Sequence, residues 1–205
     1  MHIKTDDIGR SMVEMLGVLA IVGVLSIGGI AGYVTASRNL RINNLKDEVS
    51  TLVANVRSAF FAAENYASLN NVTIINAGLV PDWMIDDDRM HIHNKNKGSV
   101  LIAPADYEYK ESGAFILVFN GLNATTCREL AISDWGSDAA TGFIAVSIKN
   151  DGDLTVEDTG LTDARISAAD NIISAKNISA NTLEKTYNLC NCQNTDTCAI
   201  AWKFL

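Results

Sequence analysis

Two groups of side chains in this sequence have the types and the spacing to do chemistry: one carboxylate beside a long apolar stretch, and four cysteines. Glu14 directly precedes Met15–Val34, which reads MLGVLAIVGVLSIGGIAGYV and carries no charge over 20 residues. A charged carboxylate costs roughly 2.5–3.5 kcal/mol near the middle of a membrane helix, and less near its end. We therefore expect Glu14 to have a function and a partner that neutralises its charge.

The cysteines allow two kinds of site. An even number of cysteines in an exported domain favours disulfides, and four cysteines allow three pairings. The alternative is a zinc site built from the C-terminal cysteines with a histidine, although CxC followed by five residues and a further Cys lacks the usual CxxC knuckles. The residues concerned are Cys127, Cys190, Cys192 and Cys198, with His91 or His93 as the histidine.

Two acidic segments could bind a divalent cation. Asp86–Asp88 lie beside His91 and His93, and Asn150–Asp153 form an acidic turn that lacks the EF-hand spacing. We expect a solvated loop at the first segment and a plain turn at the second. The sequence contains no glycine-rich phosphate loop, GxSxG elbow or Cys/His nucleophile pair, so we expect neither an enzyme nor a cofactor.

Composition narrows the class of protein further. The 205 residues are 48% hydrophobic, which argues against a disordered chain. Lys and Arg number 16 against 24 Asp and Glu, for a net charge of −8. This acidic balance argues against binding nucleic acid, which requires a basic face.

The element that carries Glu14 is long enough to cross a membrane. The neutral stretch continues through Ser37, giving 23 residues between Glu14 and Arg38. As a helix it reaches about 35 Å, against a hydrocarbon core of about 30 Å. A plain membrane anchor is one interpretation. A secretory signal peptide ending at Val34-Thr35-Ala36 is another, although signal peptides have shorter apolar cores of 7–15 residues.

Helical periodicity continues beyond this stretch. Apolar residues follow an i, i+3, i+4, i+7 pattern, and neither proline nor glycine interrupts residues 33–77. The pattern predicts one continuous helix from about Ser11 to Tyr66, roughly 80 Å long; two helices with a break near Asn43-Asn44 are the alternative. The apolar positions are Leu45, Val49, Leu52, Val53, Val56, Phe60 and Ala63.

The start of the chain resembles the N-terminus of type IV prepilins and type II secretion pseudopilins. The matching residues are Gly9, Arg10, Ser11, Met12, Val13 and Glu14, followed by the apolar stretch. The resemblance implies that a prepilin peptidase cuts between Gly9 and Arg10 and methylates the new amine. It also implies that Glu14 neutralises the amine of a neighbouring subunit in a filament. The family usually begins its mature chain with Phe, Met or another apolar residue, and this chain would begin with Arg10.

The glycines of the apolar stretch suggest close helix packing. Gly28 and Gly32 have GxxxG spacing, which lets membrane helices approach closely; general tolerance of glycine in membrane helices is the alternative. Filament helices of the superfamily often loosen near a proline, and this chain has none between Met1 and Val80. We expect the helix to loosen at Gly28, Gly29 and Gly32 instead.

The rest of the sequence, after the long helix, predicts a mixed α and β domain. Ser99–Ala103 and Ala114–Phe119 suit strands, and Thr126–Glu129 have capping-box spacing, which predicts a helix through Ile132. Further predicted elements are a short helix with Pro81 in its first turn, a hairpin of 142–149 with 153–157, helix within 163–188, and a strand at 199–204 that closes the sheet.

The order of these elements resembles the head of type IVb pilins. The matching stretches are GLVPDWM, a strand, AFILVF and the helix TTCRELA. In that group a disulfide ties a cysteine on this helix to the C-terminal segment. We therefore expect Cys127 to pair with Cys190 or Cys192, and the other of these two to pair with Cys198.

Together these features predict an α+β pilin fold, in which a long N-terminal helix packs on an antiparallel sheet. The expected domains are a leader (1–9), a helix (10–66; transmembrane over 11–34, amphipathic over 35–66) and a globular head (67–205). The resemblance implies a pilus subunit that is stored in the bacterial inner membrane with its head outside, and is then assembled into an extracellular pilus. Its implied partners are itself, other pilins, the peptidase and the assembly platform. A secretion pseudopilin or an unrelated anchored domain is the alternative.

Overall fold

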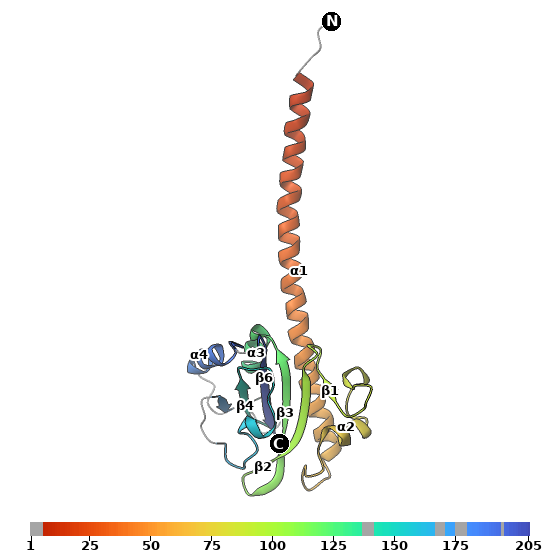
Figure 1. Cartoon of the computed structure of the whole chain (residues 1–205), viewed down its shortest axis with the longest axis vertical. Helices are drawn as coiled ribbons and strands as arrows, with labels where there is room; N and C mark the ends of the chain where they lie inside the picture. The colour runs from red at the N-terminus through yellow and green to blue at the C-terminus, as the bar shows by residue number, and fades with distance from the viewer. Residues whose placement is uncertain (1–5, 137–141, 167–170, 175–179, 194) are drawn as a thin grey trace. The chain divides into compact units, whose positions relative to one another are not determined.

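A computed structural model describes residues 6–136, 142–166, 171–174, 180–193 and 195–205 (Figure 1). The chain divides into two units, Met1–Arg41 and Ile42–Leu205. Helix α1 (Asp6–Phe60) supplies the described part of the first unit and also the start of the second. We call Ile42–Leu205 the globular unit.

The described part of the first unit is helical and carries an exposed apolar surface. Large apolar side chains between Met12 and Val34 are exposed by 49% at Val34 and by up to 74% at Tyr33. The helix continues through Gly28 and Gly32 without a break. Residues 1–5 of the expected leader lie outside the described residues.

The C-terminal part of α1 forms one wall of the core of the globular unit. Leu45, Val49, Leu52 and Val56 are completely buried, which confirms the amphipathic pattern predicted for this segment. The helix is continuous across Asn43-Asn44, so the alternative with two helices is wrong.

The helix ends at Phe60, earlier than the end predicted at Tyr66. The Tyr66 N–H donates to the Ser112 carbonyl at 2.8 Å. Its ring packs against Phe60 at 5.3 Å and Phe115 at 5.0 Å. A continued helix would carry Tyr66 about 9 Å beyond Phe60 along its axis, so these contacts require the chain to turn. Ala63 accordingly lies outside the helix and is exposed.

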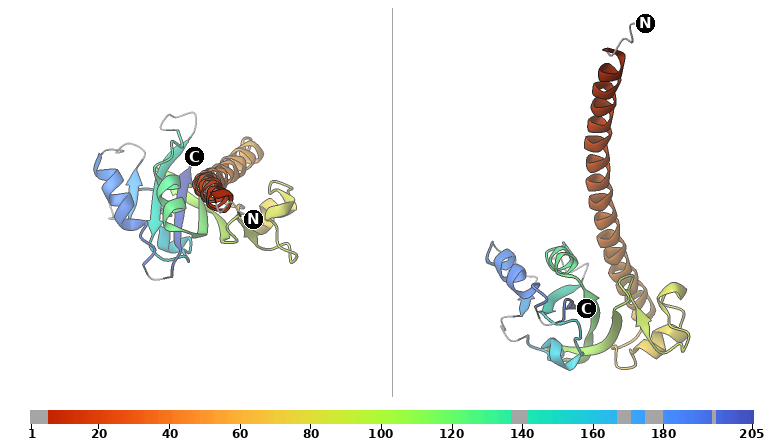
Figure 2. Two further views of the ribbon diagram at one scale, coloured as in Figure 1. Left: turned by 90° about the horizontal axis from the view of Figure 1, so that it is seen from above. Right: turned by 45° about the horizontal axis from the view of Figure 1, so that its top comes forward.

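Six strands form one antiparallel sheet in the order β1-β2-β3-β6-β4-β5. Figures 1 and 2 show α2 and β1 at one edge of the sheet and α4 at the opposite edge. The strands are β1 (Ile92–His93), β2 (Ser99–Tyr107), β3 (Lys110–Leu122), β4 (Phe143–Lys149), β5 (Ile172–Ser174) and β6 (Cys198–Phe204). The C-terminal strand β6 thus lies inside the sheet, paired with β3 and β4.

Alternation along the central strands creates two cores. Phe115, Leu117 and Phe119 of β3 join Trp202 and the buried face of α1 in the larger core. The residues between them face the smaller core, which the segment after β4 covers with Leu154 and Leu161. Both sheet faces are therefore buried, which explains why β3 and β6 read as continuous apolar runs rather than alternating ones.

The described part of the unit also contains the short α-helices α2 (Asn71–Asn76), α3 (Ala124–Ala131) and α4 (Ala180–Leu189), and the 3-10 helices η1 (Asp82–Met84) and η2 (Glu157–Thr159). Helix α3 occurs where predicted, but its N-cap is Asn123, whose side chain accepts from the Thr126 N–H at 2.9 Å. The predicted capping box with Thr126 as the cap is therefore wrong. Pro81 is the N-cap of η1 rather than part of its first turn.

Two predictions for the C-terminal third are corrected. Residues 153–157 form no strand, because β6 pairs with β4 in place of the expected hairpin partner. Ile172–Ser174 form an edge strand beside β4, within the range predicted as helix, whereas Ala180–Leu189 are helical as expected. Parts of that range, 167–170 and 175–179, lie outside the described residues.

A buried amide network joins the turn after β1 to the end of β3. The Asn94 side chain donates to the Asn120 carbonyl at 2.9 Å and accepts from the N–H groups of Asn96 and Gly98. Gly98 passes so close to β3 that a Cβ would lie 1.7 Å from the Asn120 carbonyl oxygen. Residues 94–98 are therefore held tightly in one conformation.

Lys203 is a buried cation within the sheet. It is completely buried on β6, and its Nζ donates to the Asp163 carbonyl at 2.7 Å. Burial lowers the pKa of the Lys203 ammonium to about 8, against the opposing influence of Asp106 and Asp163. The contact fastens the segment after β4 to the sheet.

This burial predicts a rise in stability at alkaline pH. Between pH 8 and the ordinary lysine pKa of 10.5 the folded chain has released this proton while the unfolded chain keeps it. The free energy of unfolding should therefore increase by about 2 kcal/mol from pH 7.5 to 9.5. Denaturant unfolding of full-length protein in detergent measures this change. Lys203→Met should remove the rise and Lys110→Met, at an exposed lysine, should retain it; an unchanged slope in Lys203→Met would contradict the assignment.

Candidate functional site: the N-terminal helix and the disulfide-bonded end of the globular unit

Among the described residues, one helix is long and apolar enough to cross a membrane, α1 from Met12 to Phe60. Its most apolar window is entirely unburied, and it lies before the part of α1 that packs in the globular unit. Glu14 stands exposed near the start of this apolar surface. The arrangement predicted from the sequence, a carboxylate at the edge of an apolar helix, is therefore present.

The glycines of the first unit leave open notches along its surface. No atom other than those of the helix itself and adjacent residues lies within 4 Å of the position that a Cβ would take at Gly28 or Gly32. A second helix could approach the backbone closely at these two positions, since they lie one turn apart on the same face.

The predicted cleavage bond between Gly9 and Arg10 lies within α1, near its start at Asp6. Glu14 follows Arg10 by four residues, which places the two positions on one face of the helix. A new amine at residue 10 would then stand about 6 Å along the axis from Glu14 of the same chain.

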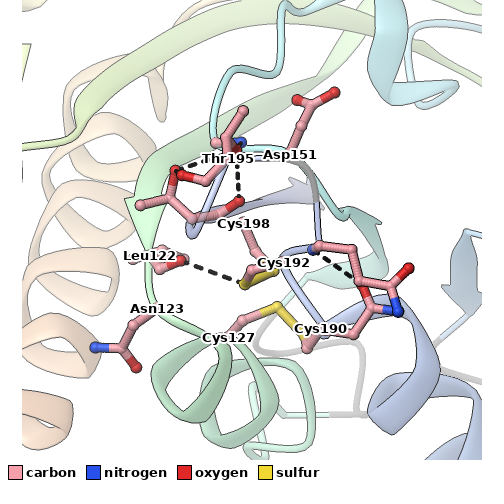
Figure 3. Close-up of a disulfide and its surroundings, with 12 residues drawn as sticks. Leu122, Asn123, Cys127, Asp151, Cys190, Cys192, Thr195 and Cys198 are labelled. Carbon is pink, nitrogen blue, oxygen red and sulfur yellow. Dashed lines mark hydrogen bonds between the residues drawn. A yellow bond between two sulfur atoms is a disulfide. The ribbon is translucent and has the colours of Figure 1, made fainter.

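Both disulfides occur in the globular unit, as predicted. Cys127 on α3 pairs with Cys190 after α4, and Cys192 pairs with Cys198 at the start of β6. The Cα–Cα distances are 5.6 and 5.0 Å. Figure 3 shows the two bridges side by side at the start of α3. Of the two partners that the sequence allowed for Cys127, Cys190 is therefore the one that it pairs with.

Neighbouring contacts hold this end of the sheet together. The Cys192 sulfur lies 3.7 Å from the Leu122 carbonyl at the end of β3, and Leu122 pairs with Cys198. The Arg128 guanidinium of α3 stacks over the Tyr187 ring of α4 at 4.2 Å. The disulfides and these contacts together link α3, α4, β3 and β6 into one corner of the domain.

The alternative metal sites are not formed by the described residues. All four cysteines are used in disulfides, so none provides a thiolate for zinc. His91 pairs with Asp88 at 2.5 Å and His93 with Asp86 at 2.8 Å, as separate exposed contacts. No group of three or more His, Cys, Asp or Glu side chains in the described chain converges on one point.

At the Asn150–Asp153 turn, the ammonium group of a lysine lies where a metal ion would have to bind. The Lys149 ammonium donates to the Asp153 carbonyl at 3.0 Å and lies 3.5 Å from the Asp151 carboxylate and 3.4 Å from that of Asp158. These oxygens already have a positively charged partner, which supports the plain turn expected from the sequence.

An open cavity of about 550 Å³ lies where α1 ends. Phe60, Phe61 and Tyr66 contribute aromatic walls, and Arg57 and Lys110 contribute positive charge. Its lining residues include one carboxylate side chain, Glu64. Sequence patterns gave no indication of this cavity, because its walls come from three separate segments.

Comparison with protein families decides the relationship. The model described as PilS N terminal matches residues 39–200. The chain belongs to the PilS N-terminal family. The match begins after the apolar stretch, so the predicted processing segment lies outside it.

A solved structure of a type IV pilin shares the fold of this chain. TcpA, a type IV pilin from Vibrio cholerae El Tor, is 18% identical, with a TM-score of 0.53 over 81% of this chain and 99% of that chain. A type IVb pilin from Salmonella typhi is 16% identical, with a TM-score of 0.49 over 80% of this chain and 97% of that chain. A comparison with curated protein sequences finds no match to this chain.

The predicted α+β pilin fold and the resemblance to type IV pilins are thus confirmed. This member of the PilS N-terminal family has the fold of a type IV pilin. Two features that bear on its behaviour, the buried Glu48 and the buried Lys203, were not found from the sequence, because charged residues are normally expected at the surface.

The two disulfides should contribute unequally to stability. Cys127–Cys190 closes 63 residues and Cys192–Cys198 closes 6. In the chain-entropy model these loops correspond to about 4 and about 2 kcal/mol of the free energy of unfolding. We expect the double variant Cys127→Ala/Cys190→Ala to lose about twice as much stability as Cys192→Ala/Cys198→Ala in urea titrations. Equal losses, or a larger loss from the short loop, would show that the entropic account is wrong here.

Proposed function

We propose that this chain is the subunit of a type IVb-like pilus and polymerises through the N-terminal part of α1 after a prepilin peptidase removes residues 1–9. The observation that carries the proposal is the apolar surface of residues 12–34, which has no partner within the described chain. Such a surface requires either lipid or other apolar helices around it. Storage in the membrane and burial in a filament provide these two environments in turn.

Glu14 would determine the register between subunits. Cleavage after Gly9 creates an amine, with an ordinary pKa near 8, that can neutralise the carboxylate. Removing that partner leaves an uncompensated charge in a low-dielectric environment, which is strongly unfavourable. A neighbour's amine can therefore select one axial position of α1 over others. Gly28 and Gly32 would let neighbouring helices pack closely around this contact.

The proposed location follows from the same features. The N-terminus would lie inside and the globular unit outside the bacterial inner membrane, before the chain enters an extracellular pilus. Two disulfides in the globular unit are consistent with an oxidising compartment. The partners would be further copies of this chain, other pilins, the peptidase and the assembly platform. The proposed parts are a leader (1–9), a helix from residue 10 and the globular head that follows it.

Processing is tested by incubating the full-length chain in detergent with the cognate prepilin peptidase. We expect a product that lacks the nine residues Met1–Gly9. Gly9→Leu should block cleavage, because the bulky side chain replaces the glycine at the cut bond, whereas Gly17→Ala should leave it intact. A product that begins after Ala36, or native protein that retains its first nine residues, would contradict the proposal.

Assembly is tested by shearing filaments from cells that express defined variants. Glu14→Gln should reduce sheared filaments at least tenfold while the processed, folded protein accumulates in the membrane. Glu111→Gln, at an exposed carboxylate of β3, is the matched control and should assemble normally.

Arg10 requires a separate arm of this test, because its side chain could pair with Glu14 within one chain. In Arg10→Phe the side chain of residue 10 is no longer cationic, so only its new N-terminal amine can pair with Glu14. Loss of filaments in Arg10→Phe/Glu14→Gln, but not in Arg10→Phe alone, supports pairing with the amine. Normal assembly of the double variant would overturn the proposed role of Glu14.

A further inference from the structure

We propose that Glu48 and Lys95 form a proton-controlled latch between α1 and the turn after β1. When Glu48 loses its proton, the Lys95 ammonium leaves the Trp83 ring and pairs with the Glu48 carboxylate. The latch lies within the globular unit and does not depend on the proposed function.

Glu48 is buried in a place where a charge is unfavourable. The side chain is 3% exposed, on the part of α1 that packs in the core. Its Oε2 accepts the Lys95 backbone N–H at 3.3 Å. Its Oε1 is buried and has no hydrogen-bond partner. A neutral carboxyl is tolerated in this environment much better than a carboxylate with one unsatisfied oxygen.

Lys95 contacts both Glu48 and the Trp83 ring. Its backbone N–H binds Glu48, while its Nζ lies 4.8 Å from the centre of the Trp83 ring. The backbone cannot move easily, because Asn94 holds the turn through the buried amide network. The flexible side chain of Lys95 is therefore the part that can change position.

Burial, opposed by most of the surrounding charges, places the change near neutral pH. Burial raises the pKa of the Glu48 carboxyl to about 7; the Lys95 N–H, the Lys95 charge and His93 oppose this rise, and Asp47 adds to it. His93 on β1 is itself paired with Asp86 at 2.8 Å. These groups, from α1, β1 and the turn, are the charged groups that influence Glu48.

The protonated and deprotonated states of Glu48 share one fold and differ in which contact of the Lys95 ammonium is the stronger. A cation over an exposed indole gains about 0.5–1 kcal/mol, whereas a buried carboxylate without a counter-charge costs several kcal/mol. Deprotonation should therefore move the ammonium to Glu48. The Trp83 ring, 46% exposed on η1, then loses its cationic cover, so the surface formed by η1 and the turn after β1 changes with pH.

Tryptophan fluorescence of the full-length chain in detergent tests the latch between pH 5.5 and 8.5. Subtracting the signal of Trp83→Phe isolates Trp83 from Trp135 and Trp202. We expect a transition in Trp83 emission with a midpoint near pH 7 in the unmodified chain. Glu48→Gln should abolish it, and Asp47→Asn, at the adjacent carboxylate, should keep it with a lower midpoint.

Lys95→Met keeps the test decisive if Glu48→Gln fails to fold. Here the Trp83 transition should be absent, while ¹³C NMR of the Glu48 carboxyl should still report titration well above the ordinary glutamate range. His93→Gln separates the histidine from the carboxyl and should retain the transition. A transition that persists in Glu48→Gln, or that disappears in His93→Gln alone, overturns the proposal.

Discussion

The apolar stretch of α1 imposes one requirement on every state of this protein: its surface must be kept out of water. Fourteen large apolar side chains between Met12 and Val34 are about half exposed or more in the isolated chain. At about 25 cal/mol per Å² of apolar area, leaving such a surface in water is far more costly than any single contact in the fold. The same helix then changes character at Ile42, where its buried face joins the core of the globular unit. One continuous element thus serves two environments.

The globular unit is held together by contacts that do not involve the apolar stretch of α1. The sheet is covered on both faces, with α1 and α3 over one and the segment after β4 over the other. Polar connections reinforce the edges of these layers: Asn94 and Asn120 join two turns to β3, and Lys203 fastens the second layer to β6. Two disulfides add covalent links at the corner where α3, α4 and β6 meet.

Sequence patterns predicted the features that depend on local periodicity or on a single residue type. The long helix, the central runs of β2 and β3, the strand at β6 and the disulfides were all found in this way. Features that depend on distant partners were not. The Asn150-Asp151-Gly152 turn was recognised, yet its expected hairpin partner was wrong because β6 occupies the place beside β4. The end of α1 was misplaced because Tyr66 is captured by Ser112 and Phe115, far away in sequence.

The position of β6 also has a consequence for how the protein is made. Its residues Cys198–Phe204 follow β3, β4 and β5 in the sequence, so they are synthesised after the strands beside them, and they fill the middle of the sheet between β3 and β4. Until they arrive, β3 and β4 each present an open edge, which favours mispairing with other chains. Closure of the sheet, and of the Cys192–Cys198 disulfide, therefore waits until β6 has been synthesised. A chaperone that covers these two strand edges would protect the nascent chain until β6 has been translated.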